Sequence, residues 1–319
     1  MRIIGDIKTI GLSPCWDTVC RLRGIDWGDH KRVDSTTVRP AGKAMNISWA
    51  LAWIGRRHTA AGLWGGEDIR QAERALRALR QWVRLALTEA PGATRRNVTV
   101  VDTLNRREMH LRNVSELATG ASLKRLGMHL RTMVRRADAC VFAGMMPDQL
   151  LAADVDRVIQ TCRAKGAAVA VDTSGPALQR IVDGGGLWLI KPNVAELCEL
   201  VGQDLADRAA PLAKAAAGLL ENVEVVLVTR GAGGAVLVTR DGVWQGRVVG
   251  RRKAAYTVGC GDYFLAGFLD AVAAGKTPAE ALAPALAAGT ARAWSLAETT
   301  TWQQAYQAIA TRITPISGR

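Results

Sequence analysis

The sequence has 319 residues, of which 49% are hydrophobic, so the chain can form one large α/β domain or two ordinary ones. Lys and Arg number 42 against 29 Asp and Glu, and the formal net charge of +13 favours anionic partners such as phosphorylated metabolites, nucleotides or nucleic acid. No apolar run approaches the length of a membrane span, and the six cysteines and four histidines show no metal-ligand spacing. We therefore expect a cytoplasmic protein with buried free thiols, and neither a zinc site nor a membrane partner.

The first part of the chain mixes helices with polar β segments. We predict a strand over 3–12, short β pieces over 17–39, a helix over 45–54, a strand over 59–63, a long helix over 68–87 and a hairpin over 96–112. The long helix is predicted from an apolar stripe. Arginines also recur with helical spacing from Arg70 to Arg84, and they favour a solvated helix face over a nucleic-acid-binding stripe. The β segments are too polar for central strands, so we expect a small peripheral sheet.

From residue 122 onwards, helices alternate with short strands that are almost wholly apolar. The strands are predicted at 139–142, 167–171, 187–190 and 225–228, with a hairpin over 235–248, and the helices at 122–136, 149–164, 177–182, 194–201, 209–220, 262–274, 278–288 and 301–309. Strands of this kind are typical of a parallel sheet covered by helices on both faces. We predict one α/β domain over 1–319, with its ligands beyond the carboxyl ends of the strands.

The segment 257–268, TVGCGDYFLAGF, carries the clearest chemical motif. Gly259 and Gly261 permit a turn in which successive amide N–H groups point into one concavity. A helix begins there, and its positive end stabilises an anion. Asp262 would act as a base beside a bound phosphate, which suits phosphoryl transfer to a hydroxyl group. The alternative is a glycine-rich turn in which Asp262 only caps the helix.

Three other segments are candidates for the nucleotide side of such a site. GKT at 275–277 resembles the end of a P-loop, but a helix precedes it and the first glycine is missing, so we reject it. GAGG at 231–234 follows a strand but opens a hairpin, and it suits a flap over a nucleotide and an ordinary turn equally. KPNVAE at 191–196 places Asn193 and Glu196 either in a capping box or as oxygen ligands of hydrated Mg²⁺ and its phosphates.

Candidates for the acceptor side lie nearer the amino terminus. AGKAMN at 41–46 puts Lys43 and Asn46 in the first turn of a helix, where they can reach a ligand or simply lie at the surface. Arg95 can bind a sugar phosphate through its guanidinium fork, although isolated surface arginines seldom do so. Asp17 can accept hydrogen bonds from sugar hydroxyls or merely shape the turn after the first strand.

Taken together and in this order, these segments resemble the ribokinase-like (PfkB) carbohydrate kinases, in particular the branch of 1-phosphofructokinases and tagatose-6-phosphate kinases. The resemblance extends from LSPCWD at 12–17 to AAGTA at 287–291, and its most specific parts are TVGCGD at 257–262, KPNVAE at 191–196 and VDTSG at 171–175. It implies a three-layer α/β/α fold with a mostly parallel central sheet. The small β lid of that fold would come from the segments near 17–39 and 95–113.

The resemblance also implies a role for each candidate residue. Asp262 would be the base, with the amides of Gly259, Cys260, Gly261 and Asp262 neutralising the transferring phosphoryl group. The sugar would be bound by Asp17, Gly42, Lys43, Asn46 and Arg95, of which Arg95 would hold the phosphate already present. The nucleotide would be bordered by Asn193, Thr229, Gly231, Gly234, Ala288 and Gly289, and Mg²⁺ would be served by Asn193 and Glu196.

Three departures from the family pattern fall near these sites. AGKA at 41–44 replaces GGKG, and if Ala44 needed a positive φ it would cost on the order of 1 kcal/mol and place a methyl group near the sugar. AGMMPD at 143–148 replaces SGSLPPG, so that Met145 stands where a hydroxyl is usual. Cys260 replaces alanine and adds an oxidisable thiol. Kinase chemistry is therefore better supported than any one acceptor.

We expect an ATP- and Mg²⁺-dependent sugar-phosphate kinase with fructose 1-phosphate as the first acceptor to test. Tagatose 6-phosphate, fructose 6-phosphate and an unphosphorylated sugar or nucleoside remain open. A non-catalytic sugar-phosphate or nucleotide sensor derived from this fold is the alternative from another class, and a nucleic-acid-binding protein would rest on charge alone. We expect no nucleic acid partner, and a homodimer that pairs lid strands is the assembly that the family implies.

Overall fold

A 10-stranded sheet forms the centre of the protein, whose structure is a computed structural model describing residues 5–250, 252–255 and 258–316. In spatial order its strands are β14 (Thr311–Pro315), β13 (Gly242–Val248), β12 (Ala235–Thr239), β11 (Val223–Thr229), β10 (Leu187–Ile190), β9 (Ala168–Asp172), β8 (Ala139–Ala143), β1 (Ile7–Gly11), β4 (His58–Gly65) and β5 (Val83–Ala90). Neighbours from β11 to β5 are parallel, and those from β14 to β11 are antiparallel. The predicted, mostly parallel sheet is thereby confirmed.

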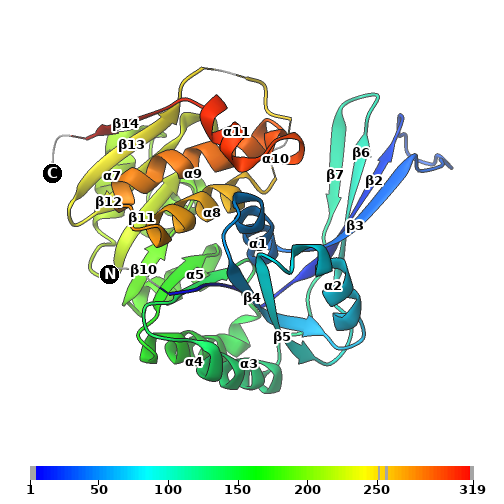
Figure 1. The fold of residues 1–319 in the computed structure, drawn as a ribbon, viewed down its shortest axis with the longest axis horizontal. Helices are drawn as coiled ribbons and strands as arrows, with labels where there is room; N and C mark the ends of the chain where they lie inside the picture. Colours follow the sequence, from blue (N-terminus) through cyan, green and yellow to red (C-terminus); the bar gives the residue numbers. More distant parts are fainter. Residues whose placement is uncertain (1–4, 251, 256–257, 317–319) are drawn as a thin grey trace.

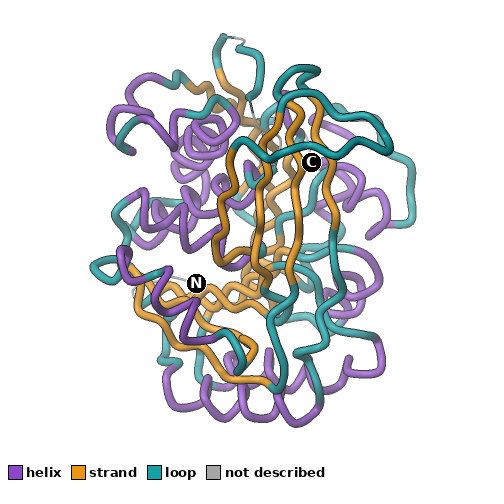
Figure 2. Tube along the Cα trace, turned by 90° about the vertical axis from the view of Figure 1, so that its right-hand side faces the viewer, coloured by secondary structure: helices purple, strands orange, loops and turns teal. Residues whose placement is uncertain are grey.

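Helices cover both faces of this sheet (Figures 1 and 2). One face packs against α3 (Gly120–Met133), α4 (Ala152–Ala164), α5 (Gly175–Asp183), α6 (Val194–Val201) and α7 (Ala209–Ala217), and the other against α1 (Lys43–Ile54), α8 (Cys260–Ala273) and α9 (Pro278–Ala293). Because successive side chains of a strand point to opposite faces, Phe142 packs in the first layer and Val141 in the second. The α/β/α layering predicted from the apolar strands is therefore present.

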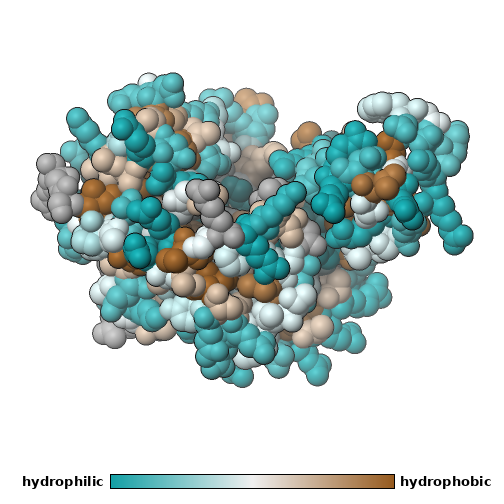
Figure 3. All heavy atoms as spheres, turned by 90° about the horizontal axis from the view of Figure 1, so that it is seen from above, coloured by the Kyte–Doolittle hydropathy of each residue, from teal (hydrophilic) through white to brown (hydrophobic). Residues whose placement is uncertain are grey.

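A separate sheet of four strands projects from the main body (Figure 1). Its order is β3 (Ser35–Ala41), β2 (Cys15–Leu22), β6 (Arg96–Asp102) and β7 (Arg107–Leu111). These strands come from the two segments whose polarity predicts a peripheral sheet. Seen from above, this sheet presents mainly hydrophilic side chains (Figure 3), which explains why it does not join the core.

The predicted helix over 68–87 is wrong. Helix α2 (Ile69–Ala75) is followed by a 3-10 turn at Arg77–Leu79, and the chain then forms β5, the edge strand of the large sheet. Arg, Ala and Leu have high helix propensity, but pairing of β5 with β4 outweighs this local preference. The C-terminal strand β14 and the short helix α10 (Leu296–Thr299), which precedes α11 (Trp302–Ala308), were also not predicted.

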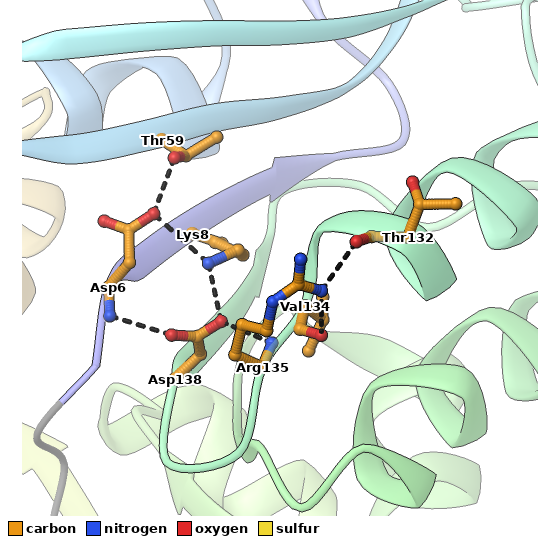
Figure 4. A network of polar contacts seen from close by, with 7 residues as sticks. All are labelled: Asp6, Lys8, Thr59, Thr132, Val134, Arg135 and Asp138. Carbon is orange, nitrogen blue, oxygen red and sulfur yellow. Dashed lines mark hydrogen bonds and ion pairs between the residues drawn. The ribbon is translucent and has the colours of Figure 1, made fainter.

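A buried polar network ties the strands together at their amino ends (Figure 4). The Nζ of Lys8, which is 2% exposed, lies 2.6 Å from Oδ2 of Asp138 and 3.2 Å from Oδ2 of Asp6. The backbone N–H groups of Asp6 and Arg135 donate to Asp138, and the Thr59 hydroxyl donates to Asp6. The network therefore joins β1, β4 and the segment before β8. Among the residues described, no helix is both long and apolar enough to traverse a bilayer.

Candidate active site

A cavity of about 1760 Å³ opens at the carboxyl ends of the parallel strands. Its walls come from the segments that follow β1, β8, β9, β10 and β11, from the starts of α1 and α8, and from the small sheet. The predicted residues that line it are Asp17, Gly42, Lys43, Asn46, Arg95, Asn193, Glu196, Thr229, Gly231, Gly234, Gly259, Cys260, Gly261, Asp262 and Gly289. As predicted, loops far apart in the sequence meet at one edge of the sheet.

Helix α8 begins at the glycine-flanked turn, and Thr257 at the start of this motif lies outside the described residues. Gly259 has a φ of 82°, a left-handed conformation that glycine adopts without strain. The first turn of a helix leaves amide N–H groups without intrahelical acceptors, and its dipole favours an anion there. The structure therefore places a helix start that is suited to an anion beside the carboxyl group of Asp262, although the backbone amide of Asp262 itself donates to the carbonyl oxygen of Gly259 at 3.1 Å.

Asp262 is almost fully buried, and its environment changes its acidity. Burial raises the pKa of its carboxyl group to about 6, and the negative charge of Asp172 acts in the same direction. The Asn46 side chain donates a hydrogen bond of 2.9 Å to Oδ2, which together with the charges of Lys191 and Lys43 opposes the rise in pKa. A carboxyl group of this pKa is a stronger base than a solvated one and is still ionised at neutral pH.

The sequence analysis gave no role to Lys191, which lines the cavity, or to Asp172, which pairs with it. Asp172 is fully buried; its Oδ1 lies 3.0 Å from Nζ of Lys43 and 3.4 Å from Nζ of Lys191, whereas its Oδ2 has no hydrogen-bond partner. A Cβ on Gly261 would lie 3.3 Å from Nζ of Lys191, so this ammonium group is adjacent to the start of α8. The available signal was a charged residue directly at or after the end of an apolar strand, in VAVD and LWLIK.

The capping box, one of the two alternatives for Asn193 and Glu196, is present at the start of α6. The side chain of Asn193 accepts a hydrogen bond of 2.9 Å from the amide of Glu196, and Oε2 of Glu196 accepts one of 2.9 Å from the amide of Asn193. Both residues also line the cavity. Within the described ranges no group of three or more His, Cys, Asp or Glu could hold a metal ion. A hydrated Mg²⁺ needs only one or two carboxylates besides water and phosphate oxygens, and Glu196 offers one at the cavity wall.

The proposed nucleotide side is formed by the loop after β11. Gly231 and Gly234 have φ values of 51° and 91°, and a Cβ on Gly234 would lie 2.0 Å from the carbonyl oxygen of Gly246. Gly234 is therefore required by a tight turn that also borders the cavity. The structure does not place Ala288 at the cavity, because this residue is fully buried in α9. Gly289 does line it, and a Cβ there would approach the carbonyl oxygen of Cys260 to 3.0 Å.

On the acceptor side, Asp17 lies at the base of the small sheet. Its Oδ1 accepts hydrogen bonds of 3.4 Å from the thiol of Cys15 and from the side-chain amide of Asn97. These two donors orient the carboxylate. Gly42, with a φ of 102°, precedes the helix that carries Lys43 and Asn46. The carboxylate of Asp17 thus faces the cavity from the small sheet and the two helix residues face it from the main body.

Arg95 lines the cavity, but backbone carbonyl groups hold its guanidinium. Its Nε donates to Pro14 at 3.2 Å, Nη1 to Asn113 at 2.7 Å and Nη2 to Ser13 at 3.1 Å. Each Nη atom carries a second N–H group, which a phosphate could still accept. Arg95 therefore also has a structural role, since it joins the loop after β1 to the segment after β7.

The departures near the acceptor have smaller consequences than the sequence suggests. Ala44 lies within α1 and is buried beside Gly11, so it is neither strained nor directed at the cavity. Met145 does line the cavity and is 54% exposed. Burial raises the pKa of the Cys260 thiol, which disfavours the reactive thiolate. Of the three departures, Met145 is the one that changes the cavity wall on the acceptor side.

Comparison with known proteins is consistent with this geometry. The profile of the pfkB family carbohydrate kinases matches residues 12–300. The chain is 32% identical over 286 residues to the 1-phosphofructokinase of Rhodobacter capsulatus, covering 86% of each protein. It is 27% identical over 294 residues to that of Bacillus subtilis (strain 168), covering 91% of this chain and 93% of the relative. Phosphofructokinase-2 from Escherichia coli in complex with fructose-6-phosphate superposes with a TM-score of 0.86 at 23% identity, over 95% of this chain and 98% of that one.

Proposed function

The chain belongs to the pfkB family of carbohydrate kinases, and we propose that it is a 1-phosphofructokinase, which transfers a phosphoryl group from ATP to fructose 1-phosphate. The product would be fructose 1,6-bisphosphate. One observation carries the chemistry: a buried carboxyl group with a raised pKa shares a cavity with an anion-binding helix start and two lysines. The names of the two bacterial relatives support the choice of acceptor.

In the proposed reaction, Asp262 accepts the proton of the sugar hydroxyl as that oxygen attacks the γ-phosphorus and ADP departs. Its pKa of about 6 lets the carboxylate accept this proton near neutral pH better than a solvated aspartate would. The amide of Asn46 fixes one carboxylate oxygen, which leaves the other for the substrate. Positioning of this kind contributes much of the rate in phosphoryl transfer.

Charge on the transferring group would be neutralised by the start of α8 and by the lysines. Lys191 lies beside Gly261, and Lys43 shares the Asp172 carboxylate with it, so both ammonium groups are held in place before substrate binds. Glu196 would hold Mg²⁺, Asn193 would assist through its place in the capping box, and the bound ion would supply further charge neutralisation at the ATP phosphates. Thr229, Gly231, Gly234 and Gly289 would border the nucleotide.

The acceptor would lie between the small sheet and α1. Asp17 and Asn46 are suited to sugar hydroxyls, whereas Lys43 and the remaining N–H groups of Arg95 are suited to the phosphate already on the sugar. We further propose that 1–319 acts as one kinase domain with the four-stranded sheet as its lid, and that a homodimer would form through that lid. The cytoplasmic location stays a prediction.

The test is a panel of acceptors given to purified protein with ATP and Mg²⁺, with ADP formation as the readout. We expect the highest kcat/KM with fructose 1-phosphate, and lower values with fructose 6-phosphate, tagatose 6-phosphate and unphosphorylated fructose. A clear preference for another acceptor would overturn the substrate assignment. Thermal stabilisation by sugar phosphates without any ADP formation would instead identify a sensor.

A further inference from the structure

A guanidinium group lies directly behind the start of α8, although it does not line the cavity. It belongs to Arg292, in the last turn of α9, whose side chain is 12% exposed. A Cβ on Gly259 would lie 3.6 Å from Nε of Arg292. A largely buried cation thus stands next to the residue that caps the anion-binding helix.

Contacts with Glu298 and Tyr263 are among those that hold this guanidinium in place. Its Nη1 forms an ion pair of 2.7 Å with Oε1 of Glu298 in α10. Its central carbon lies 5.7 Å from the ring centroid of Tyr263, the residue that follows Asp262. Such a cation–π contact is attractive, and more so where the pair is desolvated. Arg292 therefore connects α9, α10 and the first turn of α8.

Two helix dipoles act on Arg292 in opposite directions. The last turn of α9 carries a partial negative charge that favours a cation, whereas the nearby start of α8 carries a partial positive charge that disfavours one. The cation is nevertheless retained, and its charge reaches the helix start: burial raises the pKa of the Cys260 thiol, and the charge of Arg292 opposes that rise. A positive group in this position gains a further favourable interaction when an anion occupies the turn at the start of α8.

Tyr263 also connects this arrangement to the acceptor side. Its ring lies 5.9 Å, centroid to centroid, from that of Trp53, near the end of α1. Helix α1 begins with Lys43 and carries Asn46, which donates to Asp262. The ring held by Arg292 is thus packed between the helix of the base and the helix that faces the acceptor.

We propose that Arg292 is a positioning residue for phosphoryl transfer. It fixes the first turn of α8 through Tyr263, and it adds positive charge behind the amides that face the transferring group. This inference rests on the proposed role of Gly259 to Asp262 in binding that group. The charge of Arg292 should act on the phosphoryl group that is transferred from ATP and leave binding of the sugar phosphate unaffected.

The test compares Arg292→Gln, which removes the charge, with Arg292→Lys, which keeps it. We expect Arg292→Gln to lower kcat by about 10- to 100-fold and to raise KM for ATP, with KM for the sugar phosphate within about twofold of wild type. Arg292→Lys should recover most of the loss. Arg131→Gln is the matched control, since Arg131 is an exposed arginine in the last turn of α3, and it should behave as wild type.

Two further readouts separate a charge effect from simple loss of structure. The acidic limb of the pH–rate profile should not move in Arg292→Gln, because the main causes of the shifted pKa of Asp262 are burial and then the neighbours Asp172, Asn46, Lys191 and Lys43. Glu298→Gln keeps the guanidinium but removes its partner's charge, and it should retain kcat within about threefold. Three results would overturn the proposal. The acidic limb of the pH–rate profile could move in Arg292→Gln, or kcat could fall equally in Arg292→Gln, Arg292→Lys and Glu298→Gln. The third is an Arg292→Gln variant with the wild-type rate.

Failure of the proposed function would look different. If the wild-type protein phosphorylates no member of the acceptor panel, the catalytic assignment fails, and calorimetry with ATP then tests the inference by itself. Arg292→Gln should bind ATP several-fold more weakly than wild type, and Arg292→Lys nearly as well. Equal affinity in all three proteins would overturn it.

Discussion

The carboxyl group of Asp262 is held in a state that is useful for catalysis and unfavourable for folding. Its pKa of about 6 results first from burial and then from the charge of Asp172, with the Asn46 hydrogen bond opposing both. Below this pKa the carboxyl group is protonated and cannot accept the substrate proton. The same raised pKa makes two separate predictions, one for the rate and one for stability.

For the rate, we expect kcat/KM to fall as the pH is lowered through about 6, because Asp262 then becomes protonated. Asn46→Leu removes the hydrogen bond that favours the ionised form, so the limb should move to higher pH. A pH–rate profile of both proteins checks this. A wild-type limb near pH 4, the range of an ordinary aspartate at about 3.9, would contradict the role of burial.

For stability, a raised carboxyl pKa favours the folded state only where that carboxyl group is protonated. The unfolded chain releases this proton near pH 4, so the free energy of unfolding should fall as the pH rises from about 4 through about 6. Asp262→Asn removes the buried charge and should raise the free energy of unfolding by on the order of 1–3 kcal/mol at pH 8. Urea unfolding at pH 8 and pH 5 measures it, and the gain should shrink at pH 5. A variant that is less stable than wild type at pH 8 would refute this reading.

Residue identity alone could predict part of this site. Asp262, Asn193 and Lys43 stand in short motifs whose spacing indicates a helix start, and the structure brings all three to one cavity. Arg292 had no such signal, because its relation to Gly259 arises only when α9 packs against α8. Helix propensity and the spacing of residues along the chain do not reveal contacts between two helices.

At the scale of elements, the difference between strands explains which of them the sequence predicts. Strand β8 is wholly buried and wholly apolar, and β9 is wholly buried and apolar up to Asp172 at its end, so their pattern is unambiguous. Strand β5 lies at the edge of the sheet and has exposed arginine and glutamate side chains among Leu and Ala residues. Its conformation is decided by pairing with β4, a long-range contact that local propensity does not contain.

The buried polar network at the amino ends of β1 and β4 gives a stability prediction that is independent of catalysis. Lys8→Met would leave Asp138 and Asp6 without their cation in a buried network, and we expect the free energy of unfolding to fall by about 3–5 kcal/mol. Because the network lies at the opposite ends of the strands from the cavity, the kcat of the folded fraction should stay near wild type. Urea unfolding and active-site titration measure the two quantities.

Lys124→Met, which changes an exposed lysine of α3, serves as the control and should leave stability within about 0.5 kcal/mol of wild type. If Lys8→Met unfolds with the same free energy as this control, the buried network does not stabilise the amino ends of the strands.

At the scale of the whole molecule, an apolar sheet supports polar residues that gather along one of its edges. The parallel strands end together, and the polar residues after them come from distant parts of the chain. The position of the small sheet was predictable from its polarity, because strands with exposed polar side chains cannot join a buried centre. Its orientation over the cavity was not, since that depends on how β2 and β6 pair away from the main sheet.

Steady-state kinetics and ATP calorimetry of Asp262→Asn test the central claim most directly. The asparagine keeps the shape of the side chain and can still accept the hydrogen bond from Asn46, but it cannot take a proton from the sugar. We expect ATP affinity within a few-fold of wild type and a loss of kcat of at least about 100-fold. A variant that binds ATP and turns over fructose 1-phosphate at nearly the wild-type rate would contradict the assignment of Asp262 as the base.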